Sequence, residues 1–174
     1  MELSTLFYIG FLPLIIGYNI TFIFDKLGFY TGRRGLSYYR EAHLSKWNCL
    51  MHTIGMPFVY YGISIWFPML FQFSTEDGWK FQTFFYLVYM THYICVDRQV
   101  GVLTSLVYSI PYYYSVLHYE LSLYMFGYGF MISFVFLVFQ EIIGHWLGGD
   151  IWSRLEAVPN AILYAVMFSV DHLI

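Results

Sequence analysis

The chain has 174 residues, of which 59% are hydrophobic and 24% aromatic, whereas only 11% are charged. Soluble domains have about 25% charged residues, so this composition excludes an ordinary soluble protein and predicts an integral membrane protein. The formal net charge is -3 and the basic residues form no long run, which excludes a nucleic-acid-binding protein. The two cysteines have no CxxC spacing, so we expect neither a disulfide framework nor a thiolate zinc site.

The first predicted element is an apolar run at residues 5–24, about the twenty residues that an α-helix needs to cross a bilayer. No basic segment precedes it and no small-residue cleavage site follows, so we expect a retained anchor rather than a signal peptide. Five of the eight Lys and Arg residues lie just after this run, between positions 26 and 46. The positive-inside rule therefore predicts that this segment faces the cytosol and that the N-terminus faces the lumen or exterior.

Five more apolar runs follow, at residues 50–73, 81–96, 99–117, 122–144 and 157–174. They predict an all-α, polytopic membrane protein with five to six spans. The number of spans is open, because the short run at 81–96 and the run at 99–117 either cross the membrane separately or form one re-entrant unit. Pro57, Pro68 and Pro111 lie inside these runs, so we expect kinked helices. No repeat or linker interrupts the chain, which predicts a single helical domain over residues 1–174.

Counting alternate crossings sorts the polar residues between the two sides of the membrane. His43, His52, Asp97 and His145 fall on the cytosolic side, whereas His118 and His172 fall on the opposite side. For His92, His118 and His172 we expect structural hydrogen bonds rather than metal ligation. For His43, His52 and His145, which share one side with carboxylates, we expect a metal site or a proton-transfer site.

His43 and His52 constrain the local structure around them. They are nine residues apart and would point in opposite directions in a continuous helix, at 100° per residue. Both can ligate one ion only if the segment breaks between them, and a loop-to-helix join near Ser45 permits this. Asn48 is four residues before His52 on the same helical face, where its amide can orient the imidazole or a substrate carboxylate.

Two further groups of polar residues occur at the ends of apolar runs. Glu141 and His145 are four residues apart, and an imidazole beside a carboxylate favours zinc or non-haem iron. Asp97 and Arg98 either pair with each other or provide a carboxylate that orients a ligand histidine. Glu141 and Asp97 are therefore both candidates for a metal ligand in addition to the three histidines.

Four short motifs together are similar to one known family. They are Leu27-Gly28-Phe29-Tyr30, the pattern Tyr39-x3-His43-x4-Asn48-x3-His52-x4-Pro57, Asp97 after a tyrosine-rich apolar stretch, and Phe139-Gln140 leading to Gly144-His145. The chain thus resembles the membrane proteins for metabolism of phytosphingosine to odd-numbered fatty acids, which are iron-dependent 2-hydroxy fatty acid dioxygenases. The resemblance covers residues 27–174 and leaves residues 1–26 as an additional N-terminal span.

The resemblance implies a multi-pass enzyme of the endoplasmic reticulum membrane that uses Fe(2+) and O2 to shorten a 2-hydroxy long-chain fatty acid by one carbon. It implies that His43, His52 and His145 are the catalytic metal ligands. The residues expected to support the metal or the substrate are Asn48, Tyr39 and Arg98. A glutamate that follows the Gly-His pair in the family corresponds most nearly to Glu156, and Glu141 takes the position of the family's Gln.

Two other classes of function are compatible with the residues. A non-catalytic lipid-binding or transport protein would use the histidines for structural pairing or proton relay, and would hold no transition metal. A zinc-dependent lipid hydrolase would hold a different metal in the same cluster of His and Glu residues. Membrane desaturases and hydroxylases are disfavoured, because the chain lacks the HxxxH and HxxHH motifs that they need.

Overall fold

The computed structural model describes residues 4, 7–29, 31–150 and 158–174. Within these ranges the chain forms seven α-helices and two π-helical segments, and it contains no strand. The prediction of an all-α protein is therefore confirmed. The elements in chain order are η1 (Phe7–Phe11), α2 (Leu12–Lys26), α3 (Gly32–Glu41), α4 (Lys46–Met69), α5 (Thr75–Val96), α6 (Arg98–His118), α7 (Leu123–Phe139), η2 (Gln140–Leu147) and α8 (Val158–Asp171).

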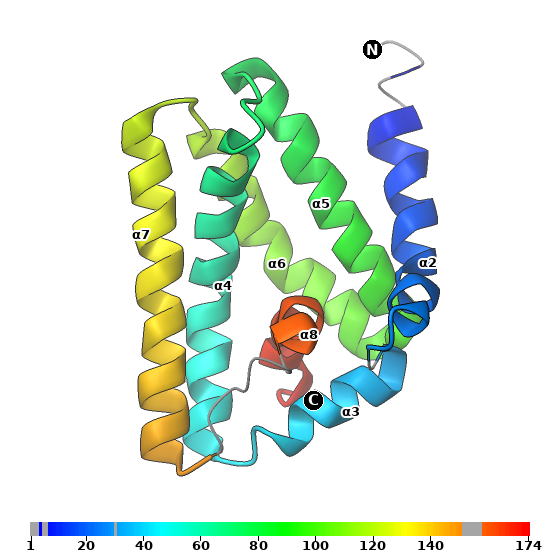
Figure 1. The fold of residues 1–174 in the computed structure, drawn as a ribbon, viewed down its shortest axis with the longest axis vertical. Coiled ribbons are helices and arrows are strands. Elements are labelled where there is room, and N and C mark those ends of the chain that lie inside the picture. The colour runs from blue at the N-terminus through cyan, green and yellow to red at the C-terminus, as the bar shows by residue number, and fades with distance from the viewer. Residues whose placement is uncertain (1–3, 5–6, 30, 151–157) are drawn as a thin grey trace.

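The helices form two groups, and a short helix lies between them (Figure 1). Helices α4 and α7 run side by side, while α5 packs against α6 and against α2. Helix α8 contacts α3, α4 and α6, so the C-terminal part of the chain fills the space at one end of the bundle. The buried residues of α8 form a continuous hydrophobic core with α3, α4, α5 and α6.

Three helical segments in the described part of the chain are long and apolar enough to cross a membrane: Phe7–Lys26, Arg98–His118 and Leu123–Leu147. The prediction of five to six spans is not confirmed. Helices α4 and α5 have sufficient length, but α4 begins with several polar residues and α5 begins with Thr75-Glu76-Asp77-Gly78. Helix α8 has only 14 residues, which at 1.5 Å per residue is about 21 Å and short for a hydrocarbon core.

The junction at Asp97 joins two long helices, and whether the pair is re-entrant in a membrane stays a prediction. Helix α5 ends at Val96 and α6 begins at Arg98, so Asp97 alone connects them. Its carboxylate caps α6 by accepting hydrogen bonds from the backbone N–H groups of Gln99 and Val100. Gly101 allows this tight turn, because a Cβ there would lie 2.4 Å from the backbone of Tyr93.

The prolines lie inside helices, as the sequence predicts. Helix α4 continues through Pro57 and α6 continues through Pro111, while Pro68 lies in the last turn of α4. The kinks expected at these positions stay a prediction.

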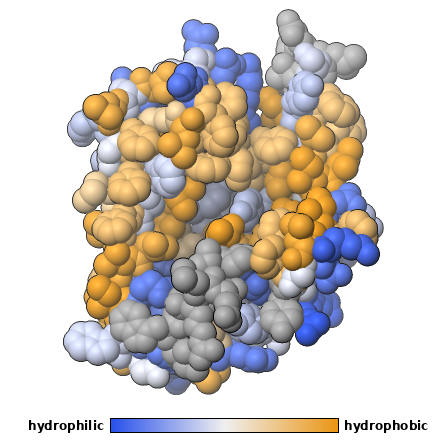
Figure 2. All heavy atoms as spheres, viewed as in Figure 1, coloured by the Kyte–Doolittle hydropathy of each residue, from blue (hydrophilic) through white to orange (hydrophobic). Residues whose placement is uncertain are grey.

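One face of the protein has an apolar middle. Figure 2 shows that hydrophobic residues predominate across the centre of this face, whereas hydrophilic residues gather toward its upper and lower ends. Many of the exposed hydrophobic side chains belong to α2 and α7, including Phe22, Phe130 and Phe134. A belt of this kind is compatible with a membrane protein, because exposed apolar side chains are stable in lipid and costly in water.

Candidate metal centre

A break between α3 and α4 allows the side chain of His43 to lie beside that of His52. Helix α3 ends at Glu41 and α4 begins at Lys46, so His43 lies in a short connection rather than in a helix. Ser45 starts the new helix, because its side-chain oxygen accepts a hydrogen bond from the backbone N–H of Trp47. The loop-to-helix join near Ser45 that ligation by both histidines would require is therefore present, and it removes the opposed orientation that a continuous helix would impose.

The third histidine comes from a π-helical segment that the sequence analysis did not predict. The chain changes from α-helix to π-helix at Gln140, and η2 buries Gln140, Gly144 and His145. The i to i+5 hydrogen bonding of a π-helix brings Gln140 and His145 to the same face. Gly144 allows η2 to approach α4 closely, since a Cβ there would lie 2.7 Å from Oδ1 of Asn48.

His43, His52 and His145 thus lie together from three different elements. One ligand atom of each lies within 4.8 Å of the others, and all three side chains are buried. The ring centroid of His43 is 4.7 Å from that of His52 and 4.8 Å from that of His145. This spacing is compatible with one metal ion, because each imidazole needs to move only slightly to ligate at about 2 Å.

The hydrogen bonds of the three rings leave at least one nitrogen of each ring that a metal ion would satisfy. Nδ1 of His43 donates to the backbone carbonyl of Tyr39 at 2.8 Å, which leaves Nε2 as the ligand atom. Nε2 of His43, both ring nitrogens of His52 and Nε2 of His145 are buried and have no hydrogen-bond partner among the described residues. Buried polar atoms normally have partners, so this concentration of unsatisfied nitrogens fits a cation site.

Burial also keeps His43 in the form that binds metals. His43 lies in the connection between α3 and α4, outside the three candidate spans. Removal from water disfavours its charged form and lowers the pKa of the imidazole to about 4. The ring is therefore neutral at physiological pH.

Tyr39 and Phe168 enclose the cluster with aromatic rings. The Tyr39 ring stacks on His43 with centroids 4.2 Å apart and planes at 16°. Phe168 of α8 lies 5.0 Å from His43 and 5.7 Å from His52, measured between centroids. Tyr39 was predicted from the sequence as a supporting residue, whereas Phe168 was not, because nothing in the sequence near Phe168 indicates that α8 returns to this site.

Asp150 is a second residue that the sequence analysis missed. Its Oδ2 accepts hydrogen bonds from Nδ2 of Asn48 at 2.9 Å and from the backbone N–H of Ser45 at 3.1 Å. The same Asn48 nitrogen lies 3.4 Å from Nδ1 of His145. Asp150 therefore ties the start of α4 to the segment after η2. The signal available in the sequence was a carboxylate five residues after His145, following Gly148-Gly149.

The other predicted site residues lie in different surroundings. Glu141 is adjacent to the cluster, with its Oε1 3.9 Å from Nε2 of His145. Asp97 caps α6 and is not part of the group of three histidines. Arg98 is exposed at the first residue of α6. Glu156 lies outside the described residues.

The remaining histidines each have a hydrogen-bonding partner. His92 contacts Thr21 at 3.5 Å and His118 contacts the hydroxyl of Tyr61 at 2.7 Å. The expectation that His172 lies on the opposite side is wrong, because its Nε2 contacts Oγ1 of Thr53, one residue from His52, at 2.6 Å. The reason is that α8 packs back against α3 and α4 near the cluster instead of leading the chain to the other end.

Comparisons of the chain with protein-family models, with curated proteins and with solved structures found no match.

Proposed function

We propose that the protein is a membrane Fe(2+)-dependent dioxygenase that shortens 2-hydroxy long-chain fatty acids by one carbon. The observation that carries this proposal is the group formed by His43, His52 and His145, with ligand atoms within 4.8 Å of one another. The substrate class is supported by the resemblance of the motifs around these histidines to a family of 2-hydroxy fatty acid dioxygenases. We further propose that the site faces the cytosol and that the membrane is that of the endoplasmic reticulum.

The donor set suits Fe(2+). Imidazole is a ligand for iron as well as for zinc, and histidines combined with a carboxylate are typical of non-haem iron oxygenases that keep coordination positions open. When bound, the ion would supply redox chemistry with O2 and a Lewis acid for the carboxylate and hydroxyl oxygens of a 2-hydroxy acid. His43, His52 and His145 would hold it, and Glu141 is the nearest acidic side chain, 3.9 Å from His145.

The surrounding residues orient the ligands and limit access of water. The carbonyl of Tyr39 holds the proton of His43 on Nδ1, so Nε2 keeps its lone pair. Asn48 and Asp150 hold the segment that follows His145 against the start of α4. Tyr39 and Phe168 cover His43 with apolar surface, which lowers the local dielectric and strengthens interactions with charged groups.

The position of the cluster suits a lipid substrate. The three histidines lie near the ends of α4 and η2, and η2 continues one of the three segments that are apolar enough to cross a membrane. A fatty acid in the bilayer would present its carboxylate at this level while its acyl chain stays among apolar helices. Lys46, exposed at the first residue of α4, is a suitable cation to attract that carboxylate.

The decisive experiment measures metal content and turnover together. The full chain is purified in detergent, loaded anaerobically with Fe(2+) and assayed for O2-dependent shortening of a 2-hydroxy fatty acid. We expect about one iron per chain, as a single three-histidine site holds one ion. His43→Ala, His52→Gln and His145→Ala should each lose both iron and activity.

His172→Gln is the matched control, because His172 lies at the same end of the protein but outside the group of three. It should retain iron and activity. The helical circular dichroism of every variant shows whether loss of iron reflects unfolding. Retention of iron and activity in His52→Gln would overturn the proposal. Zinc bound in place of iron, with lipid hydrolysis, would favour a hydrolase, and no metal under any loading condition would favour a lipid-binding protein.

A further inference from the structure

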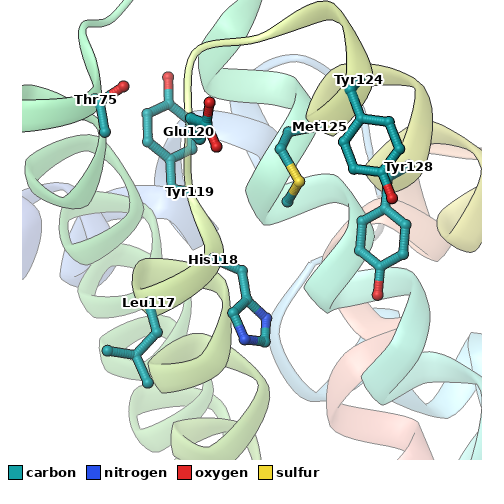
Figure 3. A pocket seen from close by; sticks show the side chains of 8 residues that line it. All are labelled: Thr75, Leu117, His118, Tyr119, Glu120, Tyr124, Met125 and Tyr128. Carbon is teal, nitrogen blue, oxygen red and sulfur yellow. The ribbon is translucent and has the colours of Figure 1, made fainter.

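A cavity of about 590 Å³ lies at the other end of the protein from the histidine cluster. It is bounded by the end of α6, the start of α7 and the connection between them, and Figure 3 shows its lining side chains. Tyr61, whose hydroxyl contacts His118 in the wall, is nine residues along α4 from His52, or about 14 Å along the helix axis. Its lining includes Leu117, His118, Glu120, Tyr124, Met125 and Tyr128.

Contacts with α5 and the preceding turn fix the walls of this cavity. The hydroxyl of Tyr119 donates to the backbone carbonyl of Phe73 at 2.8 Å, and the backbone N–H of Leu121 donates to Oγ1 of Thr75 at 3.1 Å. Gly78 makes room for the Tyr119 ring, because a Cβ there would lie 1.9 Å from it. The connection between α6 and α7 is therefore held in place by contacts within the protein.

The lining has the chemistry of a site for an organic cation. Glu120 is exposed and supplies one carboxylate, and none of the described residues that line the cavity is Lys or Arg. Tyr124 and Tyr128 lie next to each other with ring planes 14° apart and centroids 6.5 Å apart. Aromatic faces attract ammonium groups through their quadrupole, and a nearby carboxylate adds a direct charge interaction.

The location of the cavity indicates an amphiphilic ligand. It lies between the end of the span Arg98–His118 and the start of the span Leu123–Leu147, at the level where a membrane surface would be. Leu117 and Met125 provide apolar surface beside the polar residues. We propose that this cavity binds the ammonium headgroup of an amphiphile between Glu120 and the rings of Tyr124 and Tyr128.

Two sources supply such a group, a membrane lipid with a choline or ethanolamine headgroup and a free alkylammonium compound. The test titrates the detergent-purified full chain with dodecyltrimethylammonium by calorimetry, using dodecyl sulfate as the anionic counterpart. We expect saturable binding of the cation only. Tetramethylammonium tests for a free cation, and native mass spectrometry after extraction from vesicles of phosphatidylcholine and phosphatidylglycerol tests for a retained lipid.

Variants distinguish the contribution of the Tyr124 ring to cation binding from that of the Glu120 carboxylate. Glu120→Gln and Tyr124→Leu should each weaken binding of dodecyltrimethylammonium by about fivefold or more, whereas Tyr124→Phe should bind as the original chain does, because it keeps the ring. Glu76→Gln is the control, since Glu76 is an exposed carboxylate near the start of α5 that does not line the cavity. The proposal would be overturned if dodecyltrimethylammonium did not bind, or if dodecyl sulfate bound equally well. It would also be overturned if Glu120→Gln and Tyr124→Leu both bound the cation as the original chain does. These readouts do not depend on iron or on turnover.

Discussion

Tyr39 contacts His43 in two ways, since its backbone carbonyl accepts the Nδ1 proton at 2.8 Å and its ring stacks on the imidazole with centroids 4.2 Å apart. The hydrogen bond sets which nitrogen is free, and the stacking sets the plane of the ring. Helix α3 ends at Glu41, so His43 is not itself part of a helix. Its orientation therefore depends on Tyr39, which lies in the last turn of α3.

Tyr39→Ala should weaken metal binding, because it removes the stacked ring but leaves the backbone carbonyl. Changes to residues that orient ligand histidines typically cost about 10- to 100-fold in metal affinity, and we expect the lower end of this range. Tyr39→Phe keeps the ring and should bind metal as the original chain does. Competition with a chelator measures the affinity. Equal affinity in the alanine variant would show that the stacking does not orient His43.

The pH dependence of metal binding should reflect the buried state of His43. The pKa of His43 is about 4, so protons do not compete for this ligand until the pH falls toward that value. Iron content measured between about pH 7 and pH 5 should therefore show no loss attributable to His43. NMR titration of the metal-free protein should show the His43 ring neutral over the same range, and a midpoint for this ring near the ordinary pKa of histidine, about 6.5, would contradict its buried, neutral state.

The stability of the metal-free protein should fall in acid over a defined window. His43 in the unfolded chain has a pKa of about 6.5, as for a free histidine. Between about 6.5 and 4 the unfolded state binds a proton that the folded state does not bind, so the free energy of unfolding decreases as the pH decreases. The loss begins below the unfolded pKa and is complete below the folded one. Denaturation followed by circular dichroism, with His43→Gln for comparison, should show a smaller change in the variant.

Asp150→Ala should disturb His145 without removing a ligand. The change deletes the acceptor for Asn48 and for the backbone N–H of Ser45, so the start of α4 loses its connection to the segment after η2. We expect about tenfold weaker iron binding and retained helicity, and Asp150→Asn should be intermediate because its amide oxygen still accepts. Chelator competition and circular dichroism check both points. An alanine variant with unaltered affinity would limit Asp150 to a role in loop structure.

The two acidic candidates should behave differently. Glu141→Gln should weaken iron binding, since its carboxylate is 3.9 Å from Nε2 of His145. Asp97→Asn should leave both iron binding and stability nearly unchanged, because asparagine caps a helix as well as aspartate does. Iron content after dialysis measures the first effect, and thermal unfolding measures the second. The reverse order of effects would place the carboxylate ligand at Asp97.

Close packing of α4 on α7 predicts a matched pair of glycine variants. A Cβ at Gly62 would lie 2.5 Å from the carbonyl oxygen of Gly129 and 2.7 Å from the backbone nitrogen of Ser133, so the helices would have to separate. Gly62→Ala should cost about 1–3 kcal/mol of stability. A Cβ at Gly127 in α7 would meet no atom within 4 Å, so Gly127→Ala should be neutral or stabilising by up to about 1 kcal/mol. Thermal unfolding in detergent compares the two.

Much of the fold and part of the candidate site follow from local properties of the sequence. Apolar runs of helical length predict helices wherever they occur, and the described residues confirm an all-α chain. The nine-residue spacing of His43 and His52 showed that both could ligate one ion only across a break, because the angle per residue in a helix is a constant. Ser45 is also a good N-cap, so the start of α4 is a local property of the chain.

The number of spans and the full composition of the site depend on contacts between distant segments. Hydropathy alone does not show whether an apolar helix faces lipid or other helices, and α8 has most of its described side chains in the core of the protein. Its packing brings Phe168 against His43 and places His172 beside Thr53, which the order of the spans did not predict.

The sequence by itself determined the helical class, the apolar segments and the presence of three histidines with a carboxylate nearby. Only the tertiary structure decided that a π-helical segment directs His145 inward, that Asp150 joins η2 to α4 and that Phe168 closes the cluster. The physical reason is the range of the interactions involved. Helix formation and capping depend on neighbours within a few residues, whereas the position of a side chain relative to a distant one depends on how all the helices pack.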